Sequence, residues 1–276
     1  MKKYEVEGHE SSYLPEENEW KLVWNDEFDG TELDKSKWDF RLEIMGTRND
    51  AWCGDEGIEL DGNSNCVFKL IEKNGLVCSS QLQTGYNFMD AVKDHAGTKY
   101  SGGLNWPIAP LKQNKFLHKH GYYECRCKLQ KGLGWWSAFW MQSPIIGASL
   151  DPAQAGVELD IMESFAPGDV IAHFCHYNGY GIDHKAVHAG EGRKGLDLNE
   201  YHVFGMKWDE NGYDFYIDGE FDGHVAAPVS DCPQFILVGT EVKGYRDADH
   251  LPTQEARENV GDTFVVDYVR VFDAVK

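Results

Sequence analysis

The fold of this chain is decided by the stretch VELDIME at residues 157–163, in which three carboxylates alternate with aliphatic side chains. Alternate residues of a β-strand point to opposite faces of the sheet, so a strand here has one apolar and one acidic face. Glu158 and Asp160 lie on the acidic face. The apolar face, which we expect to cover a core, holds Val157, Leu159 and Ile161.

Glu163 is out of phase with the acidic face by one residue. A β-bulge at Ile161–Met162 would absorb the extra residue and turn Glu163 back toward the other two acids. The sequence therefore predicts a bulge as well as a strand. Four strand rises of about 3.3 Å put the Cα atoms of Glu158 and Glu163 roughly 13 Å apart, and the two side chains can close much of that distance by leaning together.

Strand-like runs recur along the rest of the chain, separated by turn signals such as Asn211-Gly212. Many short strands at this spacing predict an all-β sandwich or barrel. We expect one domain over residues 1–276, with residues 1–19 as a polar N-terminal extension. Long loops are expected at residues 85–100, 143–156, 178–200 and 243–262, the last with one short helix at Gln254–Asn259. The expected strands are Lys21–Trp24, Cys66–Ile71, Leu76–Gln83, Tyr122–Leu129, Ser137–Gln142, Val157–Glu163, Ile171–Tyr177, His202–Trp208, Asp214–Ile217, Gln234–Val238 and Phe264–Phe272.

The composition excludes several classes of partner. The 276 residues carry 26 Lys and Arg against 46 Asp and Glu, a net charge of −20 at neutral pH. Binding to nucleic acid needs clustered basic residues, so we expect no nucleic-acid partner, and an anionic membrane surface is excluded on the same ground. The sequence contains no apolar run of about 18 residues, so no membrane span is expected.

The compartment is left open by two features. Residues 1–19 are mixed and polar, with no apolar run after the opening lysines, so they do not read as a secretory signal. The seven cysteines are an odd number, and the ordinary burial of Cys predicts that most are reduced core thiols. Reduced thiols suit the cytoplasm, whereas a signal removed from the chain would be consistent with secretion.

Three acids on one strand face repel one another, and a purely structural strand rarely carries such a set without cationic partners. Crowding pushes the pKa values of neighbouring carboxyls apart, which leaves one group ionised and another protonated. That combination suits a nucleophile and a general acid, and a retaining glycosidase holds two such carboxyls about 5–5.5 Å apart. The alternatives are a solvated acidic strand face and a Ca²⁺ site.

The segment from Glu158 to Glu163 resembles the active-site signature of glycoside hydrolase family 16, in the bulged form with an extra residue before the last Glu. The likeness covers most of the chain. Residues 20–38 are similar to the family's N-terminal opening, and residues 266–272 to its closing strand. Residues 121–128 and 136–140 resemble the segment before the catalytic strand, with Ser137 in place of a more usual proline.

The resemblance implies a concanavalin-like β-jelly-roll sandwich with an open substrate cleft on its concave face. It also implies endo-acting, retaining hydrolysis of a β-linked polysaccharide, with no cofactor required for catalysis. Carried over by position, Glu158 is the nucleophile, and Glu163 is the general acid and then the general base that activates water. Asp160 would hydrogen-bond Glu158 and tune both pKa values.

Aromatic residues precede the acidic strand. Trp136 and Trp140 lie on one face of the expected strand, at i and i+4, where they form a flat apolar surface suited to the C–H faces of sugar rings. We therefore expect both to bind substrate, and Trp135 and Trp106 are further candidates. The alternative for all four is burial in the core.

Several polar residues are expected near the acids. His173 and His176 are three apart on an expected strand, so they point to opposite faces and cannot easily share a metal ion. By resemblance, His176 lies beside the acids and contacts Asp160 or the substrate. Residues that precede the last long loop are expected to border the cleft: Glu241, Tyr245 and Arg246.

Asp267 resembles a ligand of the Ca²⁺ site that many family members carry on the convex face. Calcium takes six to eight oxygen ligands, so one carboxylate supports at most a structural ion here, without a catalytic role. Arg126 is expected to pair with a nearby carboxylate.

We expect a monomeric endo-β-glycanase that acts on β-1,3- or mixed β-1,3-1,4-glucan. An endo-β-galactanase for agar-like or host-glycan galactans has the same strand signature, and residues 52–62 and the loop after Tyr177 do not follow a laminarinase pattern closely. The acidity favours a neutral glucan over a sulfated galactan. A non-catalytic, lectin-like carbohydrate-binding domain is a hypothesis from another class. Transglycosylation, in which a sugar instead of water resolves the glycosyl-enzyme intermediate, is a further hypothesis.

Glu158→Ala separates the enzyme from the lectin. We expect this variant to lose hydrolysis while it keeps most of its affinity for glycan, because only the reaction needs the nucleophile. Reducing-end release and binding to an insoluble glucan measure the two properties. Wild-type protein that binds glucan but releases no reducing ends would contradict the enzymatic hypothesis.

Overall fold

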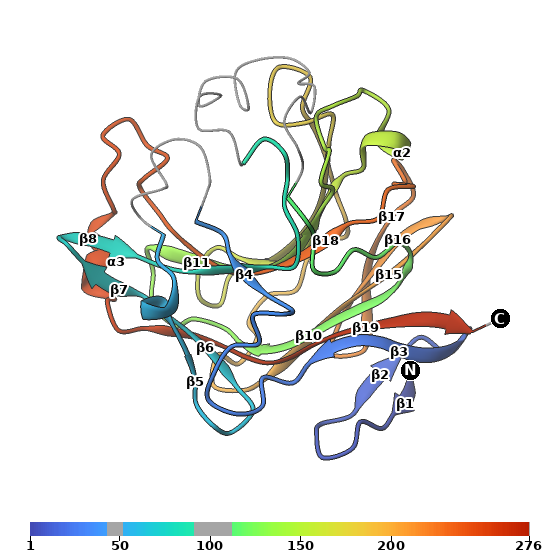
Figure 1. Ribbon diagram of the computed structural model, residues 1–276, viewed down its shortest axis with the longest axis horizontal. Helices are drawn as coiled ribbons and strands as arrows, with labels where there is room; N and C mark the ends of the chain where they lie inside the picture. The colour runs from blue at the N-terminus through green and yellow to red at the C-terminus, as the bar shows by residue number, and fades with distance from the viewer. Residues whose placement is uncertain (43–51, 91–111, 276) are drawn as a thin grey trace.

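The computed structural model describes residues 1–42, 52–90 and 112–275. Two antiparallel sheets pack face to face, and loops gather above the upper sheet (Figure 1). Helix is confined in these residues to α2 (Pro152–Ala155), α3 (Gln254–Glu258) and a 3-10 turn at Asp55–Gly57. None of the helices described is long and apolar enough to cross a membrane. The all-β prediction is confirmed, as is the short helix in the last long loop.

The first sheet has the strand order β14-β13-β12-β11-β18-β9-β4. The acidic strand, β12, is an inner strand that lies between β11 and β13. The strands of this sheet are β4 (Asp39–Phe40), β9 (Gln81–Gln83), β11 (Trp135–Gln142), β12 (Glu158–Ser164), β13 (Ile171–Tyr177), β14 (Lys185–His188) and β18 (Phe235–Val242).

The second sheet has the order β17-β16-β15-β10-β19-β6-β5, and β3 pairs with the C-terminal part of β19. Its strands are β3 (Glu19–Asp26), β5 (Ile58–Leu60), β6 (Cys66–Lys69), β10 (Gly121–Lys128), β15 (His202–Asp209), β16 (Gly212–Ile217), β17 (Glu220–Val225) and β19 (Thr263–Val275). Two small pairs complete the fold: β1 (Lys2–Tyr4) with β2 (Ser12–Leu14), and β7 (Ile71–Lys73) with β8 (Leu76–Cys78).

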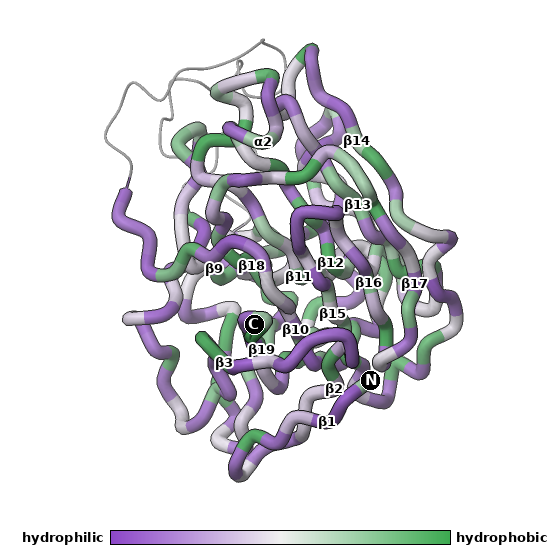
Figure 2. Tube along the Cα trace, turned by 90° about the vertical axis from the view of Figure 1, so that its right-hand side faces the viewer, coloured by the Kyte–Doolittle hydropathy of each residue, from purple (hydrophilic) through white to green (hydrophobic). Residues whose placement is uncertain are grey.

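The core lies between the two sheets. Phe139 and Leu159 of the first sheet belong to the same buried cluster as Phe204 and Val269 of the second. Because side chains alternate along a strand, the residues between these core positions point away from the core. Figure 2 shows the resulting alternation of hydropathy along the strands. On the first sheet, the outward-pointing positions form the floor of a pocket.

The predicted bulge is present in β12. Asp160 pairs with Trp140 and Glu163 with Ala138, so one residue more separates the acids on β12 than separates their partners on β11. The register against β13 shifts between the same two acids. Ile161 and Met162 are both fully buried in the core. Two consecutive inward side chains return Glu163 to the face that carries Glu158 and Asp160.

The structure differs from the sequence prediction at several places, and the strands β5 and β17 were not expected. The expected strand at residues 76–83 is divided, because the chain passes from β8 to β9 at Ser79 and Ser80, which bond to Thr240 and Cys53. The expected strand at residues 66–71 is divided at Leu70, whose N–H donates to Asp262 instead. The expected loop at residues 178–200 contains β14, an edge strand with mostly exposed side chains that carries little hydrophobic signal.

The N-terminal residues are folded against the second sheet. The β1–β2 hairpin lies below this sheet beside β3 (Figure 1), over an apolar cluster that includes Leu14, Trp20 and Phe272. Hydrogen bonds from Arg270 of β19 connect the N-terminal residues to the second sheet. Its Nη1 donates to the carbonyl of Glu10 and to Oγ of Ser12, both at 2.8 Å. The polar segment expected as an extension is thus a structural cover.

Arg270 is fully buried and pairs with Glu27 at 2.9 and 2.7 Å. Beside it, burial raises the pKa of Glu124 to about 7, although the hydroxyl of Tyr268 donates to this carboxyl at 2.6 Å. The back of the second sheet therefore carries a buried polar network, whose charge is balanced by one guanidinium.

We expect Arg270→Met to lower the free energy of unfolding by about 3–5 kcal/mol, because it leaves the Glu27 carboxylate buried without its cation. Arg193→Met is the control. Its partner Glu220 is exposed, and loss of such a pair costs about 1 kcal/mol or less. Urea denaturation measures both. Equal losses in the two variants would contradict the assigned role of Arg270.

The seven cysteines are all free thiols, and six of them are buried. Cys125 and Cys127 both point into the core from β10. The predicted core thiols are confirmed for these positions.

Candidate active site

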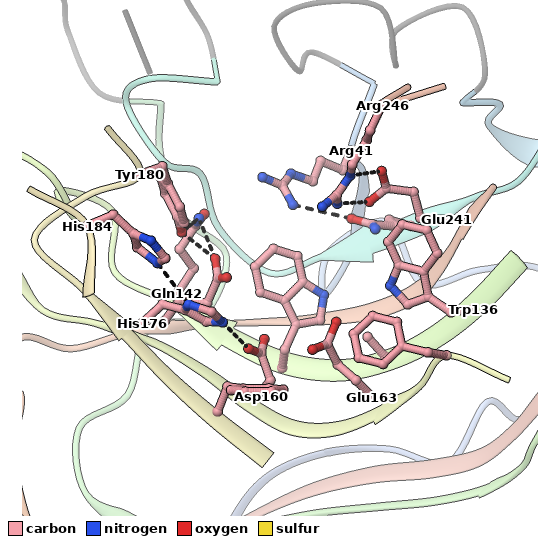
Figure 3. A pocket seen from close by; sticks show the side chains of 16 residues that line it. Arg41, Trp136, Gln142, Asp160, Glu163, His176, Tyr180, His184, Glu241 and Arg246 are labelled. Atoms are coloured by element: carbon pink, nitrogen blue, oxygen red, sulfur yellow. Dashed lines mark hydrogen bonds and ion pairs between the residues drawn. The ribbon is translucent and has the colours of Figure 1, made fainter. Parts of the chain in front are cut away.

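A pocket of about 510 Å³ lies over β11, β12, β13 and β18, on the face of the first sheet that points away from the core (Figure 3). Its floor carries Glu158, Asp160 and Glu163, so the structure brings together the three acids predicted from the sequence. Tyr180, His184 and Gln142 lie on one side of the acids, and Arg41, Arg246 and Glu241 lie on the other (Figure 3).

Glu158 is held by two donors from different elements. The hydroxyl of Tyr180 donates to its Oε2, and Nε2 of Gln142 donates to the same oxygen at 3.2 Å. Gln142 is the last residue of β11, and Tyr180 belongs to the loop between β13 and β14. Because both donors bind Oε2, the other oxygen of Glu158 keeps its lone pairs for a reacting atom.

Asp160 interacts with a histidine of the neighbouring strand. Nε2 of His176 lies 3.2 Å from Oδ2 of Asp160. Burial raises the pKa of Asp160 to about 6 in spite of the His176 bond, and Asp160 raises the pKa of His176 to about 9. We expected Asp160 to hydrogen-bond Glu158, and this partner was wrong. Asp160 pairs with the cationic His176 of β13, whereas Glu158 accepts hydrogen bonds from Tyr180 and Gln142.

Glu163 is the acid that keeps its proton. Burial is the main cause that holds its pKa well above the usual range, and the nearby charges of Asp160 and Glu158 add to the effect. Arg246 opposes this shift without cancelling it. The site therefore contains a carboxyl with a strongly raised pKa beside a carboxyl that accepts two hydrogen bonds, an arrangement that suits a general acid and a nucleophile.

Trp136 and Trp140 line the pocket, as predicted, but they do not form a bare apolar platform. The guanidinium of Arg246 lies 5.0 Å from the ring centre of Trp136, and that of Arg41 lies 4.9 Å from the ring centre of Trp140. The two rings are only 9% and 8% exposed. A sugar ring that enters this pocket therefore meets stacked guanidinium–indole pairs rather than open indole faces.

Two of the expected substrate contacts were wrong. Trp135 is fully buried in the core, where its Nε1 donates to Asp262 at 3.0 Å, because it is one residue out of phase with Trp136. Tyr245 is also buried in the core, and its hydroxyl donates to the carbonyl of Val77. Trp106 lies outside the described residues.

Glu241 and Arg246 border the pocket as expected, and they pair with each other at 2.8 and 2.5 Å. Glu241 is on β18, and it reaches the pocket because it pairs with Trp136 of β11 in the sheet register. The two histidines point to opposite faces, as expected from their spacing. His176 faces the pocket, whereas His173 is buried and lies 2.6 Å from the carbonyl of Ile161.

The calcium prediction at Asp267 is not supported. Arg126 of the adjacent strand forms an ion pair with this carboxylate, so a guanidinium already supplies the positive charge there. In the pocket, donor atoms of Glu158, Asp160 and His176 lie within 4.8 Å of one another. Hydrogen bonds within the site already account for all three groups, and we do not assign them to a metal.

Sequence reasoning missed five polar residues of the pocket: Arg41, Gln81, Gln142, Tyr180 and His184. Gln142 could have been found, because it continues the alternation of Trp136 and Trp140 along β11. Arg41, Tyr180 and His184 lie in or beside loops, where no periodicity marks the direction of a side chain. Only the tertiary structure brings these three to the acids.

The chain is similar to known proteins over much of its length. The sequence pattern of Glycosyl hydrolases family 16 matches residues 64–234. Glucan endo-1,3-beta-glucosidase A1 of Niallia circulans is 28% identical over 273 residues, which cover 91% of this chain and 37% of that protein. Beta-porphyranase D of Zobellia galactanivorans is 29% identical over 206 residues, which cover 67% of this chain and 42% of that protein. This chain thus spans less than half the length of either relative.

A similar structure is that of the endo-beta-1,3-glucanase from Pyrococcus furiosus, with a TM-score of 0.63 at 24% identity, over 99% of this chain and 98% of that one. The likeness shows the same jelly-roll fold. Fold and site together define a carboxylate-dependent glycoside hydrolase architecture. Because the family match covers more than half of the sequence, the chain belongs to glycosyl hydrolase family 16.

We expect Tyr180→Phe to lower kcat about 10- to 100-fold with little change in KM, because a lost hydrogen bond to a charged group costs about 1.5–3 kcal/mol. Tyr201→Phe is the matched control. Its hydroxyl bonds Asn65 on the second sheet, and its activity should equal that of wild type. Steady-state kinetics on soluble glucan measures both. An unchanged kcat in Tyr180→Phe would show that this hydroxyl does not serve the nucleophile.

Proposed function

We propose that this protein is a retaining endo-β-glycanase that hydrolyses internal bonds of a β-1,3- or mixed β-1,3-1,4-glucan. One observation carries the proposal: a protonated acid, Glu163, and a doubly hydrogen-bonded carboxylate, Glu158, face the same pocket from one bulged strand. This pair supplies the two carboxyl groups of glycoside hydrolysis.

In the first step, the free oxygen of Glu158 attacks the anomeric carbon, and the bond to the leaving sugar breaks. Glu163 gives its proton to the departing oxygen, and the sugar remains as an ester of Glu158. Tyr180 and Gln142 fix the attacking group, because their bonds to Oε2 restrict its rotation.

In the second step, water enters where the leaving sugar was. Glu163, now ionised, takes a proton from the water, and the resulting hydroxide attacks the anomeric carbon and releases Glu158. Asp160 supports both steps, since its charge is one of the causes that raise the proton affinity of Glu163. Two inversions leave the anomeric configuration as it was.

The charges around the pocket support a neutral substrate. Arg41 pairs with Asp90 at 2.6 Å, and Arg246 pairs with Glu241, so each guanidinium is already balanced by a carboxylate. Glu158 and Asp160 add negative charge, and His176 offsets one of them. A sulfate on the substrate would meet no net positive charge among these residues, which favours a neutral glucan over a sulfated galactan.

The names of the relatives support the glucan assignment without deciding it, because one is an endo-1,3-beta-glucosidase and another a porphyranase. The carbohydrate class is common to both. We also propose that the enzyme acts as a monomer and that residues 1–276 form one domain.

A substrate panel with product sizing tests the proposal. We expect release of oligosaccharides from laminarin or lichenan, and none from agarose, a sulfated galactan or mucin-type galactans. Proton NMR of the first products should show the β-anomer before mutarotation, because the mechanism retains configuration. Glu158→Ala, which lacks the nucleophile, is the inactive control. Cleavage of a galactan alone would replace the substrate assignment, and α-anomers as first products would contradict the mechanism.

A further inference from the structure

The loop between β13 and β14 places a second histidine against His176. Nε2 of His184 lies 2.9 Å from Nδ1 of His176, and the two rings lie edge to edge, nearly in one plane, with centres 5.1 Å apart and an interplanar angle of 18°. The other ring nitrogen of His176 faces Asp160 at 3.2 Å. Figure 3 shows His184, His176 and Asp160 as a continuous row that leads from the loop to the floor of the pocket.

We propose that His184 is a positioning residue of this site: it holds His176 with a proton on Nε2, and so keeps Asp160 an ionised hydrogen-bond acceptor. The inference rests on the proposed glycanase function for its kinetic consequences. The arrangement of the protons does not depend on that function: it follows from the contacts of His176 with His184 and Asp160 and from the charges around them.

Two arrangements of protons satisfy the contact between the rings and leave Asp160 ionised. In one, His176 is a cation and donates Nδ1–H to the bare Nε2 of His184. In the other, both rings are neutral, and His184 donates Nε2–H to the bare Nδ1 of His176. Nε2 of His176 carries a proton in both arrangements. In a third, neutral His176 donates Nδ1–H and its bare Nε2 accepts from a protonated Asp160. That arrangement is disfavoured because it leaves the proton on the weaker base: the pKa of His176 is about 9 and that of Asp160 about 6.

The surroundings favour the cationic arrangement. His176 faces Asp160 and Glu158 from β12, and His184 and Tyr180 from the loop. The two carboxyls hold the pKa of His176 at about 9, whereas burial and the His176 cation lower the pKa of His184. His184 is therefore a neutral acceptor at neutral pH, and the positive charge stays on the ring beside Asp160.

The positive charge on His176 affects the general acid, Glu163. Asp160 raises the proton affinity of Glu163, and the His176 cation compensates part of the charge of Asp160. If His176 lost its proton too early, the uncompensated charge would raise the proton affinity of Glu163 further and make it a poorer general acid. By accepting Nδ1–H, His184 stabilises the cationic form of His176, which then continues to compensate part of the charge of Asp160.

Two substitutions separate this role from packing. His184→Phe keeps an aromatic ring but removes the acceptor, whereas His184→Gln loses the ring but keeps an oxygen that can accept Nδ1–H. The His184 side chain is exposed, so both variants should fold, and thermal melting checks this. His188→Phe and His188→Gln are the matched controls, because His188 is also exposed and only meets Phe174 edge-on.

The first readout is the titration of His176, followed by ¹⁵N NMR without substrate. We expect His184→Phe to lower the pKa of His176 by about one unit or more, because the charged form loses a hydrogen bond, and His184→Gln to stay close to wild type. The second readout is kcat between pH 7 and 9. It should fall about tenfold in His184→Phe toward the alkaline end, with KM unchanged, and recover in His184→Gln.

A lowered His176 pKa and a lowered kcat in His184→Gln, with both retained in His184→Phe, would show a packing role and overturn the proposal. An unchanged His176 titration in both variants would also overturn it. The NMR readout needs no turnover. If the titrations follow the expected pattern while wild type cleaves no glycan of the panel, the proposed function fails and the role of His184 in the proton arrangement stands.

Discussion

The β-bulge at Ile161–Met162 is the constraint on which the rest of the site depends. It places two consecutive side chains in the core and returns the next residue, Glu163, to the outer face of the sheet. Without it, Glu163 would point between the sheets, where a carboxyl without partners is strongly disfavoured. The bulge thus allows one strand to satisfy the core and to present three acids to one pocket.

Electrostatic differences then give the three acids separate roles. Glu163 is held protonated mainly by burial, Asp160 is bound to a histidine cation, and Glu158 accepts bonds from Tyr180 and Gln142. None of these states is a property of the residue type. Each follows from what the neighbouring strands and the loop after β13 place beside the carboxyl, and protonated and ionised carboxyls on one strand are what two-step glycoside hydrolysis requires.

The side of the pocket that carries Arg41 and Arg246 determines which groups a sugar substrate meets there. Arg41 and Arg246 stack on the two tryptophans and pair with Asp90 and Glu241. Stacking removes the open indole face, and pairing removes the net charge. The polar edges of these groups remain as donors and acceptors, which suits hydroxyl-rich, uncharged sugars. The opposite face of the molecule uses the same device, a buried Arg270–Glu27 pair, to fasten the β1–β2 hairpin.

The sequence by itself determined most inner strands of the two sheets, the bulge and the three acids. Side-chain alternation is a local property, so one out-of-phase residue within seven positions is enough to indicate the bulge. It also placed Trp136, Trp140 and His176 on the correct faces by the same rule, and it missed Trp135 because it weighed aromatic character above phase. The tertiary structure alone decided the partners of the acids. Tyr180 and His184 come from a loop without periodicity, and Arg41 comes from a segment more than 110 residues before β12. Which side chains meet across strands and loops depends on register and on chain path, and no local pattern encodes either.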